Sequence, residues 1–287
     1  MTPVVTAPTV RARKGSGEPL VMVTAYDAPG ARIADDAGVD MILVGDSLAM
    51  VVLGYDNTLS VTVADMEHHT AAVARAKPRP MVITDLPWMS YHLDTGDAVR
   101  NAARLVRAGA QAVKLEGGRK RLPMVEAILD AEIPVMGHIG LTPQSVHMMG
   151  GFKVQGKEAA AIDVLVADGL ALAEAGCFAI VLEGVPDTVA AMVTDAVAVP
   201  TIGIGAGPWC DGQVLVFHDI LGLEDRVLPK FVRRYASLKA EAVAAMATYA
   251  SDVRGHRFPT PDESYHLMGD VRRPLPAPAE QVIGLYG

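Results

Sequence analysis

Short apolar runs rich in β-branched residues alternate along this chain with Ala-rich stretches of helical period. Eight of the runs have the length and composition of buried strands. We expect these strands at 21–26, 41–46, 81–85, 112–116, 134–138, 179–183, 200–204 and 213–218. Helices are expected between most of the strands, and the clearest examples lie at 28–38, 97–109, 121–131 and 157–176.

This order of elements indicates an α/β fold. Alternating strands and helices imply a parallel sheet with right-handed crossovers. Strands that are apolar throughout imply that both faces of the sheet are buried. Eight such units in 287 residues favour a (β/α)8 TIM barrel over an open doubly wound sheet. No G-x-G-x-x-G follows the first strand, which argues against a dinucleotide-binding fold. Only a short segment separates the last two strands, so no full helix is expected there.

We expect a single barrel domain across residues 1–287, with a short N-terminal segment (1–19) and an extended C-terminal tail (about 258–287). Two connections are unusually long, namely 47–64 after the second strand and 139–156 after the fifth. Both follow the carboxyl ends of strands, where barrel enzymes build their active sites. Long loops in compact domains are usually functional or mobile, and closure of 139–156 over a site would exclude water.

Composition and charge narrow the class of protein. The chain is 51% hydrophobic and 20% charged, which is ample for a full core. Its net charge of −8 and its lack of a long basic run argue against nucleic-acid binding. Two cysteines without a C-x-x-C pair are typical of a reducing compartment. We find neither a secretory signal nor an apolar run of membrane-spanning length, so a cytoplasmic protein without membrane partners is expected.

Ionisable residues recur where the predicted strands end. Because the carboxyl ends of barrel strands meet at one mouth, these side chains should form a ring there. A single acid at a strand end can equally be a helix N-cap or a loop anchor, and this alternative stays open for two of them, Asp27 and Asp219. The residues are Asp27, Asp46, Asp85, Lys114 with Glu116, His138, Glu183 and Asp219.

The ring contains more carboxylates than cations. Buried carboxylates are costly unless they are paired or bind a metal, and Lys114 alone cannot offset Asp46, Asp85 and Glu116. A hard divalent cation would resolve the excess charge, and Mg²⁺ typically takes one or two carboxylates together with substrate oxygens. We therefore expect Asp46 and Asp85 as the nearest metal ligands. Glu116 is expected as a third ligand or as a partner through water.

Glu183 is the remaining carboxylate and lies on another strand. A carboxylate whose pKa is raised by burial can remove a proton beside a metal-polarised carbonyl. Lys114 would supply positive charge for a substrate carboxylate or for the enolate. The pattern predicts carbon–carbon bond chemistry on an α-keto acid. His138 is either a pocket residue or a hydrogen-bonded scaffold histidine. The G-I-G-A-G at 203–207 is either a phosphate cradle or a tight turn between strands.

Motifs at every strand end resemble one enzyme family. They are V-T-A-Y-D (23–27), V-G-D-S-L-A-M-V-V-L-G-Y-D-N-T (44–58), D-L-P-W-M-S-Y (85–91), V-K-L-E-G-G (113–118), M-G-H-I-G-L-T-P-Q-S-V (136–146), G-G-F-K-V-Q-G-K (150–157), V-L-E-G-V-P (181–186) and T-I-G-I-G-A-G (201–207). In this order they resemble the 3-methyl-2-oxobutanoate (ketopantoate) hydroxymethyltransferases over about residues 15–265.

The resemblance implies a reaction and a barrel of the phosphoenolpyruvate/pyruvate type. A hydroxymethyl group would pass from 5,10-methylenetetrahydrofolate to 3-methyl-2-oxobutanoate (α-ketoisovalerate). The product would be 2-dehydropantoate (ketopantoate), for pantothenate and coenzyme A biosynthesis. The resemblance also implies bound Mg²⁺ and assembly as a homodecamer.

Roles carried over by matching motif agree with those argued from the residues. They are Asp46 and Asp85 as metal ligands that also line the keto-acid site, Ser47 and Lys114 as keto-acid contacts, Glu116 at the metal, His138 as a pocket residue and Glu183 as the proton acceptor.

Two alternatives remain. The first is a lyase or mutase of the same barrel superfamily, but such enzymes tend to use a catalytic loop that carries a cysteine. The corresponding loop here, 141–157, has none. The second is a non-catalytic metabolite-binding barrel, which we would expect to have lost Glu183 or one of the metal aspartates. Glu183 and the two metal aspartates, Asp46 and Asp85, are all present.

Overall fold

The computed structural model describes residues 4–266 of the chain. Its contacts divide the chain into a barrel unit, Met1–Leu238, and a C-terminal unit, Lys239–Gly287. Most of the tail predicted from about residue 258 lies outside the described residues. No helix among residues 4–266 combines the length and the apolar character needed to cross a membrane.

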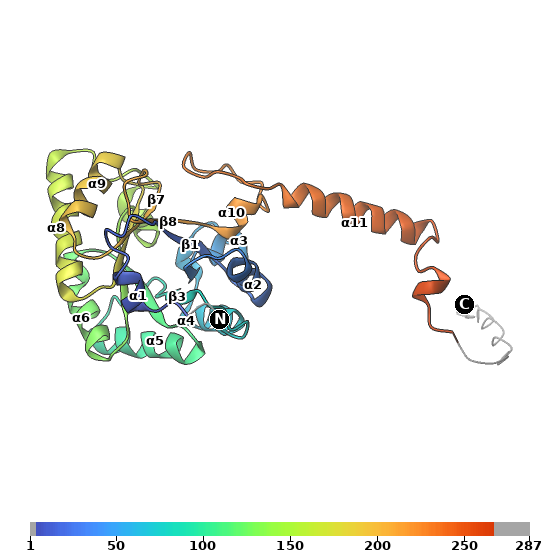
Figure 1. The fold of residues 1–287 in the computed structure, drawn as a ribbon, viewed down its shortest axis with the longest axis horizontal. Helices are drawn as coiled ribbons and strands as arrows, with labels where there is room; N and C mark the ends of the chain where they lie inside the picture. The colour runs from blue at the N-terminus through green and yellow to red at the C-terminus, as the bar shows by residue number, and fades with distance from the viewer. Residues whose placement is uncertain (1–3, 267–287) are drawn as a thin grey trace, which may run out of the picture. The chain divides into compact units, whose positions relative to one another are not determined.

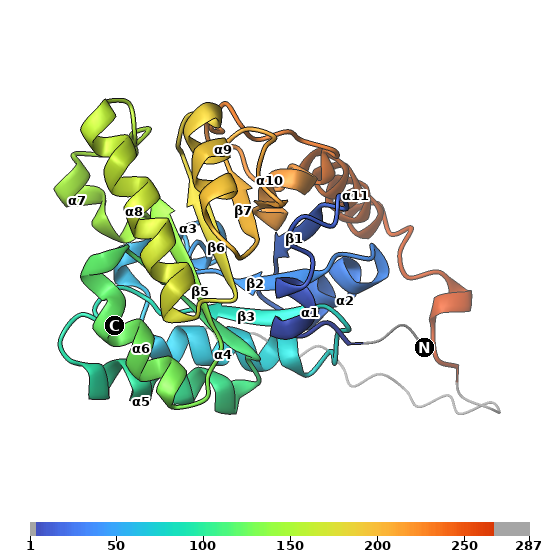
Figure 2. The same cartoon turned by 60° about the vertical axis from the view of Figure 1, so that its left-hand side comes forward.

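Eight parallel strands close into a barrel in chain order (Figure 2). Each strand pairs with the next, and β8 pairs with β1 to complete the ring. The (β/α)8 prediction and all eight strands are therefore confirmed, with small differences at the strand ends. The strands are β1 Leu20–Thr24, β2 Met41–Val44, β3 Met81–Asp85, β4 Ala112–Glu116, β5 Val135–Gly140, β6 Ala179–Glu183, β7 Thr201–Ile204 and β8 Gly212–Leu215.

Helices cover the outside of the barrel (Figures 1 and 2). The longer ones are α2 Ala28–Asp36, α4 Val63–Ala74, α5 Thr95–Ala108, α6 Leu122–Asp130, α8 Ala159–Ala175 and α9 Asp187–Ala196. The shorter ones are α1 Ala7–Arg11, α3 Leu48–Val51, α7 Val146–Met149 and α10 Phe217–Leu221, with 3-10 turns η1 Thr58–Ser60, η2 Arg119–Arg121 and η3 Pro143–Ser145. The four helices predicted from sequence are confirmed, and only a turn joins β7 to β8, as predicted.

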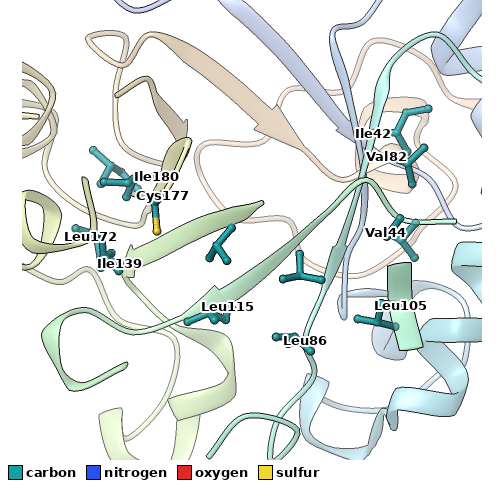
Figure 3. Packing of buried hydrophobic residues seen from close by; sticks show 14 of the residues in the cluster. Ile42, Val44, Val82, Leu86, Leu105, Leu115, Ile139, Leu172, Cys177 and Ile180 are labelled. Atoms are coloured by element: carbon teal, nitrogen blue, oxygen red, sulfur yellow. The ribbon is translucent and has the colours of Figure 1, made fainter. Parts of the chain in front are cut away.

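Side chains along each strand alternate between two apolar clusters, because successive residues of a strand point to opposite faces. In β2, Ile42 and Val44 point outward and pack with the helices, whereas Met41 and Leu43 point into the barrel. Figure 3 shows the outer cluster, in which Leu105 of α5 lies among such strand residues. The inner cluster is rich in methionine, which fills irregular interiors well.

The N-terminal segment takes part in this interior. Helix α1 contributes Ala7 and Val10 to the inner cluster, and the Thr6 side chain caps the helix by accepting from Thr9 N. Lys14 then donates to the Asp211 carboxylate at 2.9 Å. The sequence analysis assigned no helix to residues 1–19, because five residues are too few to show helical periodicity.

The end of the predicted eighth strand is wrong. We expected strand 213–218, but β8 ends at Leu215 and Phe217–Leu221 forms α10. Phe217 N donates to Thr24 Oγ1 at 2.9 Å, which turns the chain away from the sheet. Asp219 therefore lies in a short helix, where its carboxylate pairs with Arg226 at 2.8 Å. Asp27 is an N-cap, accepting from Gly30 N at 2.7 Å at the start of α2.

The described part of the C-terminal unit is formed mainly by helix α11, Leu238–Arg254, which the sequence analysis did not predict. Two residues of this helix contact the segment that follows it: the rings of Tyr249 and Phe258 lie 5.5 Å apart, and Arg257 pairs with Asp252 at 2.9 Å. A 3-10 turn, η4 Pro261–Glu263, ends the described part. These contacts order residues 249–263 within their own unit.

Candidate active site

A cavity of about 400 Å³ opens at the carboxyl ends of the strands. The charged residues of the site continue the inward-facing side of each strand. In β4, for example, inward-facing Ala112 is followed two and four positions later by Lys114 and Glu116. The cavity is lined by every site residue predicted from sequence: Asp46, Ser47, Asp85, Lys114, Glu116, His138 and Glu183.

Lys114 and Asp85 form a buried ion pair. They are paired residues on the neighbouring strands β3 and β4, and Lys114 Nζ lies 2.8 Å from Asp85 Oδ1. The other oxygen of Asp85 accepts a hydrogen bond from Asp46 N at 3.0 Å. Burial by itself lowers the pKa of Lys114, but the carboxylates of Asp85, Glu116 and Asp46 raise it above its ordinary value. Lys114 is therefore the fixed positive charge of the cavity floor.

Asp46 is held in an unfavourable environment for its charge. Burial and the nearby Asp85 carboxylate raise the pKa of Asp46 to about 7. The amide of Gln144 partly compensates, because Gln144 Nε2 donates to Asp46 Oδ2 at 2.9 Å. The same amide nitrogen also donates to Leu86 O at 3.0 Å. The side-chain amide of Gln144 thus orients the Asp46 carboxylate, and Lys114 supplies positive charge nearby.

Gln144 and Tyr91 are site residues that the sequence analysis missed. The Tyr91 hydroxyl donates to Gln144 Oε1 at 2.6 Å, and Gln144 N donates to Glu116 Oε2 at 3.0 Å. Both side chains are buried. Each lies in a loop after a strand, within motifs quoted above, but a polar loop residue has no periodic pattern that marks it as buried.

Glu116 faces Gln144 and His138. Its Oε1 lies 3.6 Å from His138 Nδ1, and burial followed by the charge of Asp46 raises the pKa of Glu116 well above its ordinary value. Within residues 4–266, no three His, Cys, Asp or Glu side chains converge as a group that could hold a metal. The role of Glu116 as a third metal ligand therefore stays a prediction.

Glu183 is the carboxylate most accessible from the cavity. Its side chain is 17% exposed, against 4% for Asp85, and burial raises its pKa to about 7. His138 Nε2 lies 3.4 Å from Glu183 Oε2, although without hydrogen-bond geometry. Burial and the charge of Lys114 lower the pKa of His138 well below its ordinary value, so this imidazole is neutral. His138 therefore separates Glu183 from Glu116 without neutralising either one.

Ser47 is positioned by Tyr26, which lies just after the end of β1. Its Oγ lies 2.9 Å from the Tyr26 hydroxyl, and Tyr26 O in turn contacts His69 Nδ1 at 2.7 Å. A Cβ on Gly45 would lie only 2.8 Å from Ser47 Oγ, so the V-G-D-S sequence needs glycine at this point. The resulting turn places Ser47 beside Asp46 in the cavity lining.

The donor set of the cavity floor suits magnesium. Mg²⁺ prefers hard oxygen ligands and takes one or two carboxylates, which Asp46 and Asp85 can supply. Burial first, and then the charge of Asp85, raise the pKa of Asp46 even with Lys114 nearby, so a second cation would favour the ionised form of this carboxyl group. A divalent cation at these two carboxylates would offset their negative charge.

The sequence of the whole barrel matches one family. The family model described as ketopantoate hydroxymethyltransferase matches residues 4–261. The chain belongs to the ketopantoate hydroxymethyltransferase family. It is 55% identical over 270 residues to a 3-methyl-2-oxobutanoate hydroxymethyltransferase of Methylobacterium sp. (strain 4-46), covering 94% of each chain. A protein of the same name from Moorella thermoacetica is 56% identical over 262 residues, covering 91% of this chain and 97% of its own.

Solved structures with the same fold are more distant in sequence than these ketopantoate hydroxymethyltransferases. A phosphonopyruvate hydrolase in complex with oxalate and Mg²⁺ has a TM-score of 0.60 at 15% identity, covering 91% of this chain and 93% of its own. A 2,3-dimethylmalate lyase of the PEP mutase/isocitrate lyase superfamily has a TM-score of 0.58 at 20% identity, with the same coverage. These similarities confirm the predicted barrel type.

Proposed function

We propose that the protein transfers a hydroxymethyl group from 5,10-methylenetetrahydrofolate to 3-methyl-2-oxobutanoate, forming 2-dehydropantoate for pantothenate and coenzyme A biosynthesis. Family membership and the names of the relatives support the reaction. The observation that carries the proposal is one cavity in which Glu183, with its pKa raised to about 7, faces the Asp46, Asp85 and Lys114 cluster.

The floor of the cavity would hold both Mg²⁺ and the keto acid. Asp46 and Asp85 are the proposed ligands, with Glu116 as a third ligand or a partner through water. When bound, Mg²⁺ would supply positive charge that polarises the keto group and acidifies the adjacent C–H bond. Lys114 and Ser47 bind the oxygens of the keto acid, since one provides a fixed positive charge and the other a hydroxyl.

Glu183 is the proposed base. It accepts the proton from C3 of the keto acid, and a carboxyl group whose pKa lies near 7 is well matched to this task at neutral pH. Lys114 stabilises the negative charge that then develops on the substrate. The C3 carbanion equivalent attacks the methylene carbon of the folate in its iminium form, in which the bond to one folate nitrogen is already broken. Water then displaces the second nitrogen and supplies the hydroxyl oxygen, and the proton taken up by Glu183 together with the remaining proton of water leaves both nitrogens protonated. The balance is keto acid, methylenetetrahydrofolate and water giving 2-dehydropantoate and tetrahydrofolate.

The loop after β5 helps to exclude water. Gln144 anchors its first part to Asp46 and to Leu86 O. Phe152 and Lys153, farther along the loop, line the same cavity. Closure of the loop 139–156 around bound substrates stays a prediction. Because Gln144 anchors the first part of this loop, we expect the second part to move on closure.

We also propose that the protein works as a cytoplasmic homodecamer on small molecules, without nucleic-acid or membrane partners. These proposals rest on the composition and on the family resemblance. Light scattering coupled to size-exclusion chromatography tests the assembly, and a mass other than that of ten chains would contradict it.

Proton NMR of 3-methyl-2-oxobutanoate in D₂O tests the function directly. With protein, tetrahydrofolate and Mg²⁺, we expect the C3 proton signal to disappear, and EDTA should prevent this loss. Glu183→Gln should abolish exchange while Mg²⁺ binding is retained. Glu126→Gln, an exposed glutamate of α6, is the matched control and should exchange normally.

The outcomes separate two kinds of error. Normal exchange by Glu183→Gln would mean that another group is the base. An absence of exchange with folded, metal-loaded wild-type protein would contradict the proposed reaction. The alternative of a superfamily lyase finds less support, because the fold relatives of that kind are only 15–20% identical.

A further inference from the structure

The cavity changes the sign of its charge from floor to mouth. The buried carboxylates Asp46, Asp85 and Glu116 form the floor. The more exposed part of the lining, here called the mouth, carries three cations, Lys153, Arg226 and Lys230. Two aromatic residues, Phe152 and Phe231, line the same mouth. The proposed chemical steps use none of these five side chains.

The cations at the mouth are mostly uncompensated. Arg226 pairs through Nη2 with the buried Asp219 carboxylate, but its Nε has no hydrogen-bond partner. Lys153 and Lys230 are exposed, and neither forms an ion pair with an acidic side chain within residues 4–266. Two lysines are therefore free to bind an anionic ligand at the entrance.

The two phenylalanine rings are exposed beside the cavity, 53% for Phe152 and 38% for Phe231. The Phe231 ring packs closely against Gly205 in the segment between β7 and β8, where an added Cβ would lie only 2.6 Å from Phe231 Cδ1. Gly205 also has φ +62°, which favours glycine. Gly205, the second glycine of the G-I-G-A-G sequence, therefore leaves room for an aromatic ring at the cavity, and the phosphate cradle stays a prediction.

The arrangement matches the shape of the second substrate more closely than that of the first. A five-carbon keto acid needs only the oxygen-binding groups of the floor. Its co-substrate must bring the methylene group to C3 from the open side, since strands close the other sides. Tetrahydrofolate carries flat ring systems and ends in glutamate carboxylates, so it needs aromatic surfaces followed by cations.

We infer that Phe152 and Phe231 contact the rings of the folate co-substrate, while Lys153 and Lys230 bind its glutamate carboxylates. This assignment rests on the proposed function and names the residues that select its second substrate. Each further γ-linked glutamate adds one carboxylate, so a polyglutamate chain gains more from the two lysines than a monoglutamate does.

Steady-state kinetics and calorimetry on the full-length protein test this assignment. Lys153→Ala, Lys230→Ala and the double variant are compared with Lys77→Gln, an exposed lysine after α4 on the amino-terminal side of β3. We expect each mouth variant to raise the KM for methylenetetrahydrofolate triglutamate by about twofold to fivefold, the range for an exposed charge pair. The KM for the keto acid and the rate of C3 exchange should not change.

Calorimetry keeps the assignment testable without turnover. Tetrahydrofolate triglutamate should bind the double variant more weakly than wild type, and added salt should reduce this difference. Phe231→Leu should weaken binding of the monoglutamate as well, because it removes a ring contact. A circular dichroism melt shows whether each variant is folded.

Three results would overturn the inference. One is unchanged folate affinity in the double variant of a protein that turns over normally, which would leave the proposed function intact. Another is an equal rise in KM for both substrates, which would mean that the lysines only attract anions. The third is a folded wild-type protein that binds no tetrahydrofolate triglutamate. Loss of C3 exchange in the wild type, by contrast, would count against the proposed function, and calorimetry would still decide the folate assignment.

Discussion

Gln144 Nε2 donates a hydrogen bond to Asp46 Oδ2 at 2.9 Å, although 98 residues separate the two in sequence. The backbone N–H of Gln144 also donates to Glu116 Oε2 at 3.0 Å. One residue of the loop after β5 therefore orients two of the three carboxylates proposed to lie at the metal. Tyr91 completes this arrangement by donating to Gln144 Oε1.

Replacing Gln144 should weaken metal binding. Gln144→Leu removes the donor that orients Asp46, and loss of such outer partners typically costs about 10–100-fold in metal affinity. Isothermal calorimetry with Mg²⁺ measures the change. Gln155→Leu is the matched control in the same loop, because within residues 4–266 its side-chain amide hydrogen-bonds only to Lys153 O. Equal affinity in Gln144→Leu and wild type would show that Asp46 needs no such support.

Removing the buried cation should destabilise the protein. Lys114→Met leaves Asp85 and its neighbouring carboxylates without their positive partner, a change that costs about 3–5 kcal/mol for a buried pair. Urea denaturation without metal measures the free energy of unfolding. Added Mg²⁺ should recover part of the loss, because it supplies charge at the same carboxylates. Lys120→Met in η2 controls for the loss of a lysine at the surface. Equal stability of the two variants would contradict this account.

The exchange rate should depend on the ionisation of Glu183. A base acts in its deprotonated form, and the pKa of Glu183 is raised to about 7 by burial. C3 exchange should therefore rise about tenfold per pH unit below 7 and level off above it. NMR exchange rates between pH 5 and pH 9, with saturating substrate and Mg²⁺, measure the profile. A rate that stays constant from pH 5 upward would show that Glu183 is fully ionised there, against the expectation.

The same shift predicts how stability changes with pH. The folded pKa of Glu183 lies above its ordinary value of 4.5, so the folded state binds this proton more tightly than the unfolded state. Its contribution to stability is complete below pH 4.5 and is lost as the pH rises through about 7. Glu183→Gln keeps a neutral side chain throughout, so its stability relative to wild type should increase between pH 5 and pH 8. Urea denaturation at both pH values tests this, and a difference independent of pH would contradict it.

Metal binding should release protons. Burial and Asp85 raise the pKa of Asp46 to about 7, and a carboxyl group must lose its proton to bind Mg²⁺. Mg²⁺ affinity should therefore increase between pH 6 and pH 8, with proton release at the lower pH. Calorimetry in two buffers of different ionisation enthalpy counts the protons. Asp46→Asn should bind Mg²⁺ more weakly and lose most of this release. If its proton release equals that of wild type, another group supplies the proton.

The strand pattern was readable because most strands, β2 to β5 among them, are buried on both faces. Runs such as M-I-L-V at 41–44 are apolar throughout, and an ionisable residue at or near the end of most of these runs marks the mouth of the barrel. The prediction was wrong at the end of the eighth strand. The apolar run V-L-V-F at 214–217 continued past the true strand end, and the bond from Phe217 N to Thr24 Oγ1 is where the chain leaves the sheet and α10 begins.

The amino-acid sequence alone determined the barrel, the order of its strands and the ring of ionisable residues, because a period of two and the parallel topology place strand ends together. Only the tertiary structure decided which charges meet. Asp85 pairs with Lys114, Asp46 with Gln144, and His138 lies neutral between two glutamates. These pairings depend on contacts of about 3 Å in the folded protein and on the loss of water around each group. The spacing of residues along the chain predicts neither the contacts nor the loss of water.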